Sequence, residues 1–165
     1  PFHHLANTAG LQSFPEAHFN MVRIGWGLFR NVLSLKSYVI HVKSIPANES
    51  ISYDSRFTTK RPSTIATVCV GYADGVPRAL ANTGYVFIQK TPCPIVGTIC
   101  MDMMMVDVTD LMHSVQVGDD VHVFGKMDSE KDDRLCTVDH IGQLTGLNPR
   151  EITCRIGARS DRVLV

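Results

Sequence analysis

Hydrophobic and polar residues alternate along two stretches of the chain, 35–45 and 85–89, as they do in β-strands that bury one face. Residues 65–70 are nearly all apolar or β-branched, which also favours a strand, and further strands are expected at 103–108 and 121–124. This spacing of short strands predicts a mainly β fold, a mostly antiparallel sandwich or barrel over residues 34–125. The turn signals that separate the strands lie at 46–48, 81–84, Pro92, Pro94, 118–120 and Gly125.

A short helix is expected before the strands, within residues 13–22. Ser13 can serve as its N-cap, and Pro15 is tolerated in the first turn. After the strands, the mixed charge run at 128–134 is expected to be a solvated loop.

A second helix is expected over residues 137–145, where apolar residues recur at helical spacing and Gly146 can end the helix. We expect a last strand or two within residues 151–165. The apolar positions of this helix are Val138, Ile141 and Leu144.

Composition limits the kind of partner. The 165 residues include 16 basic and 16 acidic side chains, so the formal net charge is zero, and no Lys/Arg run marks a nucleic-acid or membrane-surface binder. The five cysteines form no Cys-x-x-Cys pair, which favours free thiols in a reducing cytoplasm over disulfides and indicates no metal site. Without a signal peptide or an 18-residue apolar run, we expect a soluble cytoplasmic protein with a small-molecule partner. The chain begins at Pro1, and we expect it to be a piece of a longer polypeptide.

Two segments combine an apolar strand with turn residues in an unusual way. Residues 70–78 and 95–102 each run from apolar residues into Gly and Asp beside an aromatic or sulfur side chain. Gly opens the backbone and Asp turns it, so polar groups are presented at a strand end. Something is therefore expected to bind there. A third segment, Gly25-Trp26-Gly27 near Arg23, can expose N–H groups to an anion, although by itself a simple glycine turn is the preferred explanation.

Five short motifs occur in one order along the chain, and this series resembles the alanine racemase family. That family has His-x-Ala-Asn-Ser, Arg-x-Gly-Ile, Val-Ser-Tyr, Gly-Tyr-Ala-Asp-Gly with a following Arg, and Cys-Met-Asp. The matching segments here are His4-Leu5-Ala6-Asn7-Thr8, Val22-Arg23-Ile24-Gly25, Ile51-Ser52-Tyr53, Gly71 to Gly75 with Arg78, and Cys100-Met101-Asp102.

The resemblance implies two parts. Residues 1–32 correspond to the last strand-loop-helix piece of a pyridoxal-phosphate-binding (β/α)8 barrel, and residues 33–165 correspond to the C-terminal β domain. It also implies an activity, the interconversion of L- and D-alanine through an aldimine of pyridoxal 5′-phosphate. In bacteria this reaction supplies D-alanine for cell-wall peptidoglycan.

The resemblance also implies cofactor contacts in the first part. Thr8 would offer its hydroxyl, and Gly25 and Trp26 their backbone N–H groups, to the cofactor phosphate. Arg23 would face the pyridine nitrogen, and an arginine there donates a hydrogen bond without protonating the ring. Three further residues would bind the cofactor: His4, Asn7 and Arg150. Of these, His4 would also orient Arg23.

Tyr53 is the catalytic residue that the resemblance implies. Racemisation needs proton transfer on both faces of the substrate Cα. In the family a tyrosine serves one face and the Schiff-base lysine serves the other, and that lysine lies N-terminal to this segment. Asp54 follows Tyr53 where Gly is common, and a carboxylate there would oppose formation of the phenolate. Because the Schiff-base lysine lies outside this segment, the isolated chain is expected to be inactive.

Other residues are implied for the substrate and its entrance. The Met101 backbone N–H would bind the substrate carboxylate, with Cys100 and Asp102 beside it. Two departures from the family pattern concern the entrance, because Arg150 stands where a tyrosine is frequent and Thr98 where some members have arginine. The residues implied around the site and its entry channel are Tyr72, Asp74, Arg78 and Thr98.

The family also implies a homodimer in which each active site is completed by the partner subunit. Two alternatives remain open. The altered entrance is compatible with a racemase for serine or for a broader set of amino acids, and the chain could be a non-catalytic β module used for assembly or ligand binding.

Overall fold

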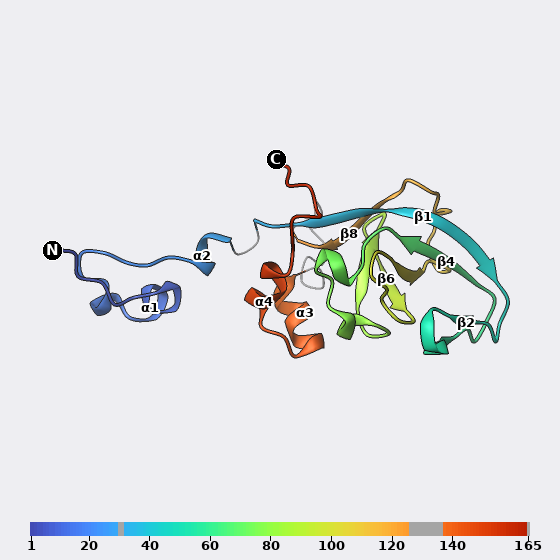
Figure 1. Ribbon diagram of the computed structural model, residues 1–165, viewed down its shortest axis with the longest axis horizontal. Coiled ribbons are helices and arrows are strands. Elements are labelled where there is room, and N and C mark those ends of the chain that lie inside the picture. Colours follow the sequence, from blue (N-terminus) through green and yellow to red (C-terminus); the bar gives the residue numbers. More distant parts are fainter. Residues whose placement is uncertain (30–31, 126–136, 165) are drawn as a thin grey trace. The chain divides into compact units, whose positions relative to one another are not determined.

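The computed structural model describes residues 1–29, 32–125 and 137–164, and these residues form two compact units, Pro1–Leu33 and Ser34–Val165 (Figure 1). The charge run at 128–134 lies outside the described residues, so its assignment as a loop stays a prediction. In the described residues, no helix is long and apolar enough to cross a membrane.

The first unit contains three short helices, α1 (Thr8–Ser13), η1 (Pro15–Ala17) and α2 (Trp26–Phe29). Of the short helix expected within 13–22 only a three-residue 3-10 helix at Pro15–Ala17 is present, and Ser13 is not its N-cap but the last residue of α1. Asn7 is the actual N-cap, and its side chain accepts the Gly10 N–H at 3.0 Å. Phe19 has a φ of 48°, which prevents a helix from continuing there.

The second unit is built on a closed antiparallel barrel, which confirms the mainly β prediction (Figure 1). The strand order is β1-β4-β7-β6-β5-β8, so the barrel closes where β8 pairs with β1. Closure leaves no free edge in this sheet. The strands are β1 (Leu35–Ile45), β4 (Ser63–Val68), β5 (Tyr85–Ile88), β6 (Thr91–Val96), β7 (Met104–Asp107) and β8 (Asp120–Phe124).

Strand β6 contradicts one sequence expectation, since Pro92 and Pro94 lie inside a strand and not in a turn. Ile95 N–H donates to Gly84 O at 2.9 Å, so alternate residues of β6 direct their N–H groups toward β5 and the two prolines lie between them. On its other side β6 pairs with β7 only at Ile95 and Val96. The missing N–H groups of both prolines therefore cost no ladder hydrogen bond.

The barrel core is filled by alternate residues of these strands. A two-stranded sheet, β2 (Ser50–Ile51) and β3 (Phe57–Thr58), joins it through the buried residues Ile51, Ile65 and Val96, with Phe57 packed against them. Three 3-10 turns, η2 (Tyr53–Ser55), η3 (Tyr72–Asp74) and η4 (Arg78–Leu80), lie in the connections. The fully buried side chains include Val39, Val68, Val86, Ile88, Ile95, Met104, Val106 and Phe124.

Two helices follow the strands, α3 (Val138–Thr145) and α4 (Pro149–Cys154). The first confirms the expected helix, because Thr137 caps its start and Gly146 ends it with a φ of 73°. The expected strand within 151–165 is wrong, since residues 149–154 are helical and no strand is assigned over 155–164. The Asn148 side chain accepts the Arg150 N–H at 3.0 Å, so this Asn-Pro pair starts a helix.

Candidate functional site

The two Gly- and Asp-containing segments interlock through their backbones. Tyr72 N–H donates to Cys100 O and Ala73 N–H donates to Met101 O, each at 3.0 Å. Gly71 allows this approach, because a Cβ on it would lie 2.3 Å from Met101 O. The turn at 71–75 and the loop at 100–102 therefore form one unit of structure.

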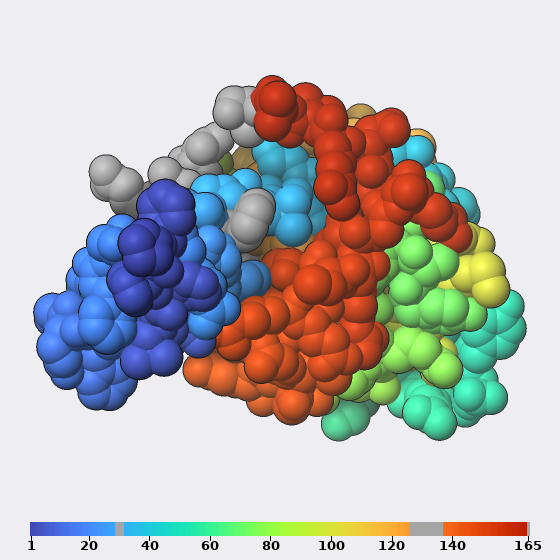
Figure 2. Space-filling view, turned by 60° about the vertical axis from the view of Figure 1, so that its left-hand side comes forward, coloured from blue at the N-terminus to red at the C-terminus, as the bar shows by residue number. Residues whose placement is uncertain are grey.

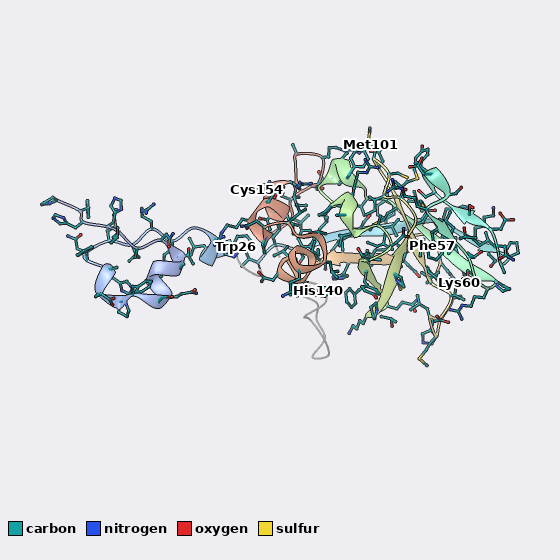
Figure 3. All side chains as sticks on the ribbon, turned by 90° about the horizontal axis from the view of Figure 1, so that it is seen from below. Trp26, Phe57, Lys60, Met101, His140 and Cys154 are labelled. Carbon is teal, nitrogen blue, oxygen red and sulfur yellow. The ribbon has the colours of Figure 1, made fainter. Side chains whose placement is uncertain are left out.

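These hydrogen bonds decide where the Met101 N–H points. In a trans peptide the C=O and the following N–H point in opposite directions, so Cys100 C=O, which faces Tyr72, turns the Met101 N–H away from the 71–75 turn. Among the described residues this N–H has no acceptor. The Met101 side chain is 53% exposed and lies at the surface of its unit (Figure 3). The geometry therefore leaves a backbone donor for a ligand.

Arg159 also joins the two segments, and the sequence offered no signal for it. Its Nε lies 3.3 Å from Asp74 Oδ1, and one of its terminal nitrogens donates to Asp102 Oδ1 at 2.6 Å. The hydrogen bond to Asp102 and the charge of Asp74 raise the pKa of Arg159 above its ordinary value. The second oxygen of Asp74 accepts the Gly71 N–H at 2.8 Å, which closes the turn.

Tyr72 and Arg78 form a contact beside this unit of structure. The Arg78 guanidinium lies 5.7 Å from the centre of the Tyr72 ring, within the range of a cation–π interaction. Both side chains are exposed. A positive charge is thus held over an aromatic ring next to the loop that contains Met101.

Tyr53 stands on a loop that is fixed to the same region. Its side chain is 70% exposed, while its backbone carbonyl accepts the Thr98 hydroxyl at 3.1 Å. Ser52 donates to Thr98 O at 2.7 Å and lies 3.7 Å from Cys100 Sγ. A phenol on the surface is therefore attached to a backbone that is held in place. Ser52 belongs to a sequence motif, but its role in supporting this loop is seen only in the structure.

The Tyr53 loop has an unusual backbone. Ser52, Asp54 and Ser55 have φ values of 67°, 62° and 48°. A positive φ is tolerated best by Gly, then by Asn and Asp, so Asp54 suits this backbone better than most side chains would. The Asp54 carboxylate lies 3.9 Å from Arg56 Nε, so part of its charge is balanced locally.

Gly97 and Asn82 contact the backbone of the Tyr53 loop and support it. Gly97 has a φ of 75°, and a Cβ on it would lie 2.8 Å from Ile51 O and from Ser52 Cβ. Asn82 accepts the Gly97 N–H at 2.7 Å and donates to Arg56 O at 3.3 Å. Asn82 is a further residue that no sequence motif indicated.

Within the second unit, the structure brings together eight of the predicted site residues. A continuous series of contacts leads from the Tyr53 loop through Thr98 and Cys100 to Tyr72 and Arg78, and from Met101 to Asp74 and Asp102. Arg150 lies apart from this series, exposed in the first turn of α4. The eight residues are Tyr53, Tyr72, Asp74, Arg78, Thr98, Cys100, Met101 and Asp102.

The first unit holds the other predicted residues. Thr8 Oγ1 accepts the Gly25 N–H at 3.2 Å and the Gly27 N–H at 3.3 Å, so a hydroxyl and two N–H groups converge. A hydroxyl beside N–H groups is a donor set that suits a phosphate dianion. Trp26 begins α2 at the same point, and a Cβ on Gly25 would meet nothing within 4 Å, which leaves room beside the donors.

Arg23 is held by the chain that precedes Thr8. Its N–H donates to Ala6 O at 2.9 Å, and its guanidinium donates to Leu5 O at 3.4 Å. Asn7 is occupied as the cap of α1, and the His4 side chain is exposed. In the described part of the chain, no group of three or more His, Cys, Asp and Glu side chains could hold a metal ion.

Comparison with known proteins identifies the family. The family described as "Alanine racemase, C-terminal domain" matches residues 32–164. The alanine racemase of Methanococcus maripaludis is 41% identical to the chain in an alignment 178 residues long, gaps included. The alignment covers 99% of the chain and 46% of that protein. The chain therefore spans about half the length of this relative.

Solved structures agree with the sequence match. Alanine racemase from Clostridium difficile in complex with cycloserine is 33% identical, with a TM-score of 0.85 over 96% of this chain and 44% of that one. Alanine racemase from Bartonella henselae with covalently bound pyridoxal phosphate is 32% identical, with a TM-score of 0.86 over 97% and 46%. Since the family match, the relatives and the folds all coincide, the chain belongs to the alanine racemase family.

Proposed function

We propose that this chain supplies the C-terminal part of an alanine racemase, which interconverts L- and D-alanine with pyridoxal 5′-phosphate as cofactor. The observation that carries the proposal is the exposed Tyr53, whose loop is hydrogen-bonded to the segment that presents the Met101 N–H. The names of the relatives and the pyridoxal phosphate bound in the Bartonella henselae enzyme support it.

Tyr53 transfers a proton on one face of the substrate Cα. When bound, pyridoxal phosphate supplies an electron-withdrawing ring that makes the Cα proton acidic. A lysine in a part of the polypeptide outside these 165 residues serves the opposite face. The hydrogen bond from Thr98 holds the backbone of Tyr53, so the side chain extends from a fixed point of the chain.

The remaining residues bind and orient. Met101 N–H donates to the substrate carboxylate, flanked by Cys100 and Asp102. Arg23 would donate to the ring nitrogen of the cofactor, and because arginine keeps its protons, this contact would not protonate the ring. The phosphate contacts are Thr8, Gly25 and Trp26, with His4, Asn7 and Arg150 as further cofactor-binding residues.

The enzyme acts as a cytoplasmic homodimer in this proposal, and its product enters bacterial cell-wall synthesis. The free thiols Cys69, Cys93, Cys100 and Cys154 support a reducing compartment. The active site is shared, with Tyr53 and Met101 reaching the cofactor of the partner subunit. Mixing full-length Tyr53→Phe subunits with subunits that lack the cofactor lysine tests this point, because only a shared site recovers part of the activity.

The proposed function is tested with the full-length enzyme and two tyrosine variants. Tyr53→Phe is expected to lower the rate of alanine racemisation by about 10²- to 10⁴-fold, since it removes a general acid–base group. Tyr85→Phe is the matched control, because Tyr85 is also exposed, at 41%, but belongs to β5 of the barrel. The rates are measured in both directions, together with the wash-in of solvent deuterium at Cα.

Equal activity of the two variants would remove Tyr53 from the mechanism. Racemisation of alanine, serine and lysine by the wild-type enzyme decides the substrate, and alanine is expected to be the best. Failure to racemise any of them would favour the non-catalytic β module.

A further inference from the structure

The segment that follows α4 packs on the 71–75 turn. A Cβ on Gly75 would lie 2.7 Å from Ile156 Cδ1 and 2.8 Å from Arg155 O, so the two backbones are in direct contact. Ile156 is buried, at 8% exposure. Figure 2 shows the C-terminal segment in red lying on the surface beside the green segment that contains residues 71–80. The position of Arg159 is therefore defined by packing three residues earlier.

Arg159 uses two different nitrogens for two carboxylates on separate segments. Nε faces Asp74 at 3.3 Å, and a terminal nitrogen faces Asp102 at 2.6 Å. The Asp74 side chain is only 14% exposed, and its other oxygen closes the turn by accepting the Gly71 N–H. A planar guanidinium offers a separate nitrogen to each carboxylate at a fixed spacing, whereas a lysine ammonium presents all its donors on one nitrogen.

The ion pair between Arg159 and Asp102 affects the charge next to the Met101 N–H. Asp102 directly follows Met101, whose N–H has no acceptor among the described residues. A carboxylate without its counter-ion at this position would repel an anionic group that approaches the N–H. Arg159 balances Asp102 and at the same time holds its segment against the 71–75 turn.

We propose that Arg159 is a positioning residue for substrate binding, which acts through Asp102 and Asp74 to keep the Met101 N–H directed at the substrate carboxylate. The inference rests on the proposed function, because it takes the substrate to be an amino acid bound at Met101. Arg159 itself touches neither substrate nor cofactor in this scheme.

The test compares Arg159→Met with Arg61→Met in the full-length holoenzyme. Arg61 is a matched control, because its side chain is 54% exposed against 51% for Arg159, but it pairs with one carboxylate, Asp110, and not with two. Arg159→Met is expected to raise KM for L-alanine about two- to fivefold, the range for loss of the exposed ion pair with Asp102, with a smaller change in kcat. Added salt is expected to lower this KM, because it screens the unpaired Asp102.

Two further variants separate positioning from general stability. Arg159→Lys keeps the charge without the planar fork and is expected to have a KM between those of the wild type and Arg159→Met. Adding Asp102→Asn to Arg159→Met removes the unpaired carboxylate and is expected to recover part of the loss. Hydrogen exchange at the Tyr72 and Ala73 amides, which donate to the Met101 loop, is expected to be faster in Arg159→Met alone.

An unchanged KM in Arg159→Met, or an equal rise in Arg61→Met, would overturn the inference. These results differ from failure of the proposed function, in which the wild-type enzyme itself would not racemise alanine. In that case, faster hydrogen exchange at the Tyr72 and Ala73 amides of Arg159→Met would still show that the ion pairs hold the two segments together, because this measurement does not depend on activity.

Discussion

Gly71→Ala tests whether the two motif segments really form one unit. Gly71 has φ and ψ values of −145° and −161°, an extended conformation that alanine adopts without strain. The cost is therefore steric. An added Cβ would lie 2.3 Å from Met101 O, 2.4 Å from Cys100 O and 2.5 Å from Met101 C, and all three are backbone atoms that no side-chain rotation can move away.

The magnitude follows from what must shift. The loop at 100–102 has to retreat by about 1 Å to reach ordinary contact distance, and this weakens the two 3.0 Å hydrogen bonds from Tyr72 and Ala73. Overpacking costs about 1–3 kcal/mol and each hydrogen bond about 0.5–1.5 kcal/mol. Alanine recovers about 0.4–1 kcal/mol by restricting the unfolded chain, so we expect a net loss of about 3 kcal/mol, the middle of the range of roughly 1–6 kcal/mol that these terms span.

Calorimetry of the full-length protein measures this loss, and we expect the barrel unit to unfold roughly 5–10 °C lower. Hydrogen exchange at Tyr72 and Ala73 is expected to accelerate by at least about tenfold. Gly157→Ala is the control, because a Cβ there meets nothing within 4 Å and its φ is not left-handed, so its stability stays within about 0.5 kcal/mol of the wild type. If the two variants unfold at the same temperature with the same exchange rates, the interlocked arrangement is refuted.

Two more perturbations probe neighbouring features. Gly97→Ala places a Cβ 2.8 Å from Ile51 O at a φ of 75°, so it displaces the Tyr53 loop and is expected to lower kcat about 10- to 100-fold; unchanged kinetics would show that the loop does not depend on Gly97. Burial raises the pKa of Cys93 to about 11, so folding favours the protonated thiol. The stability that this thiol contributes is complete below its unfolded pKa of about 9 and is lost as pH rises through about 11. Between those values the wild type is expected to lose on the order of 2 kcal/mol more than Cys93→Ala in denaturant titrations, and parallel pH profiles would contradict this.

Much of the barrel could be predicted from local pattern. The alternation at 35–45 and the β-branched run at 65–70 became β1 and β4, because a strand that buries one face or lies inside a barrel needs those residue types. Pro92 and Pro94 of β6 predicted a turn, because proline has no N–H to donate to a neighbouring strand. Only the pairing with β5 shows that the N–H groups at these two positions are not needed for hydrogen bonds between the strands. The helix at 149–154 was missed although Asn148 and Pro149 carry a start signal, because its few apolar residues show little period.

The candidate site shows the same division. The series of motifs indicated Tyr53, Met101 and their neighbours, because each motif is a short run of adjacent residues that can be recognised in the sequence. Arg159 and Asn82 belong to no such run, and Ser52 lies in a motif that gave it no role. Each of the three reaches a partner at least 15 residues away in the sequence. Sequence spacing contains no information on which distant groups meet.

The sequence by itself determined the strand-rich second unit, the family motifs and the catalytic candidate, because hydrophobic period and motif chemistry are written in neighbouring residues. Only the tertiary structure decided that the 71–75 turn and the 100–102 loop share backbone hydrogen bonds, that the Met101 N–H turns away from them, and that Arg159 joins their carboxylates. The physical reason is that hydrogen bonds and ion pairs depend on distances of about 3 Å between atoms, and closure of the barrel, not the order of residues, brings those atoms together.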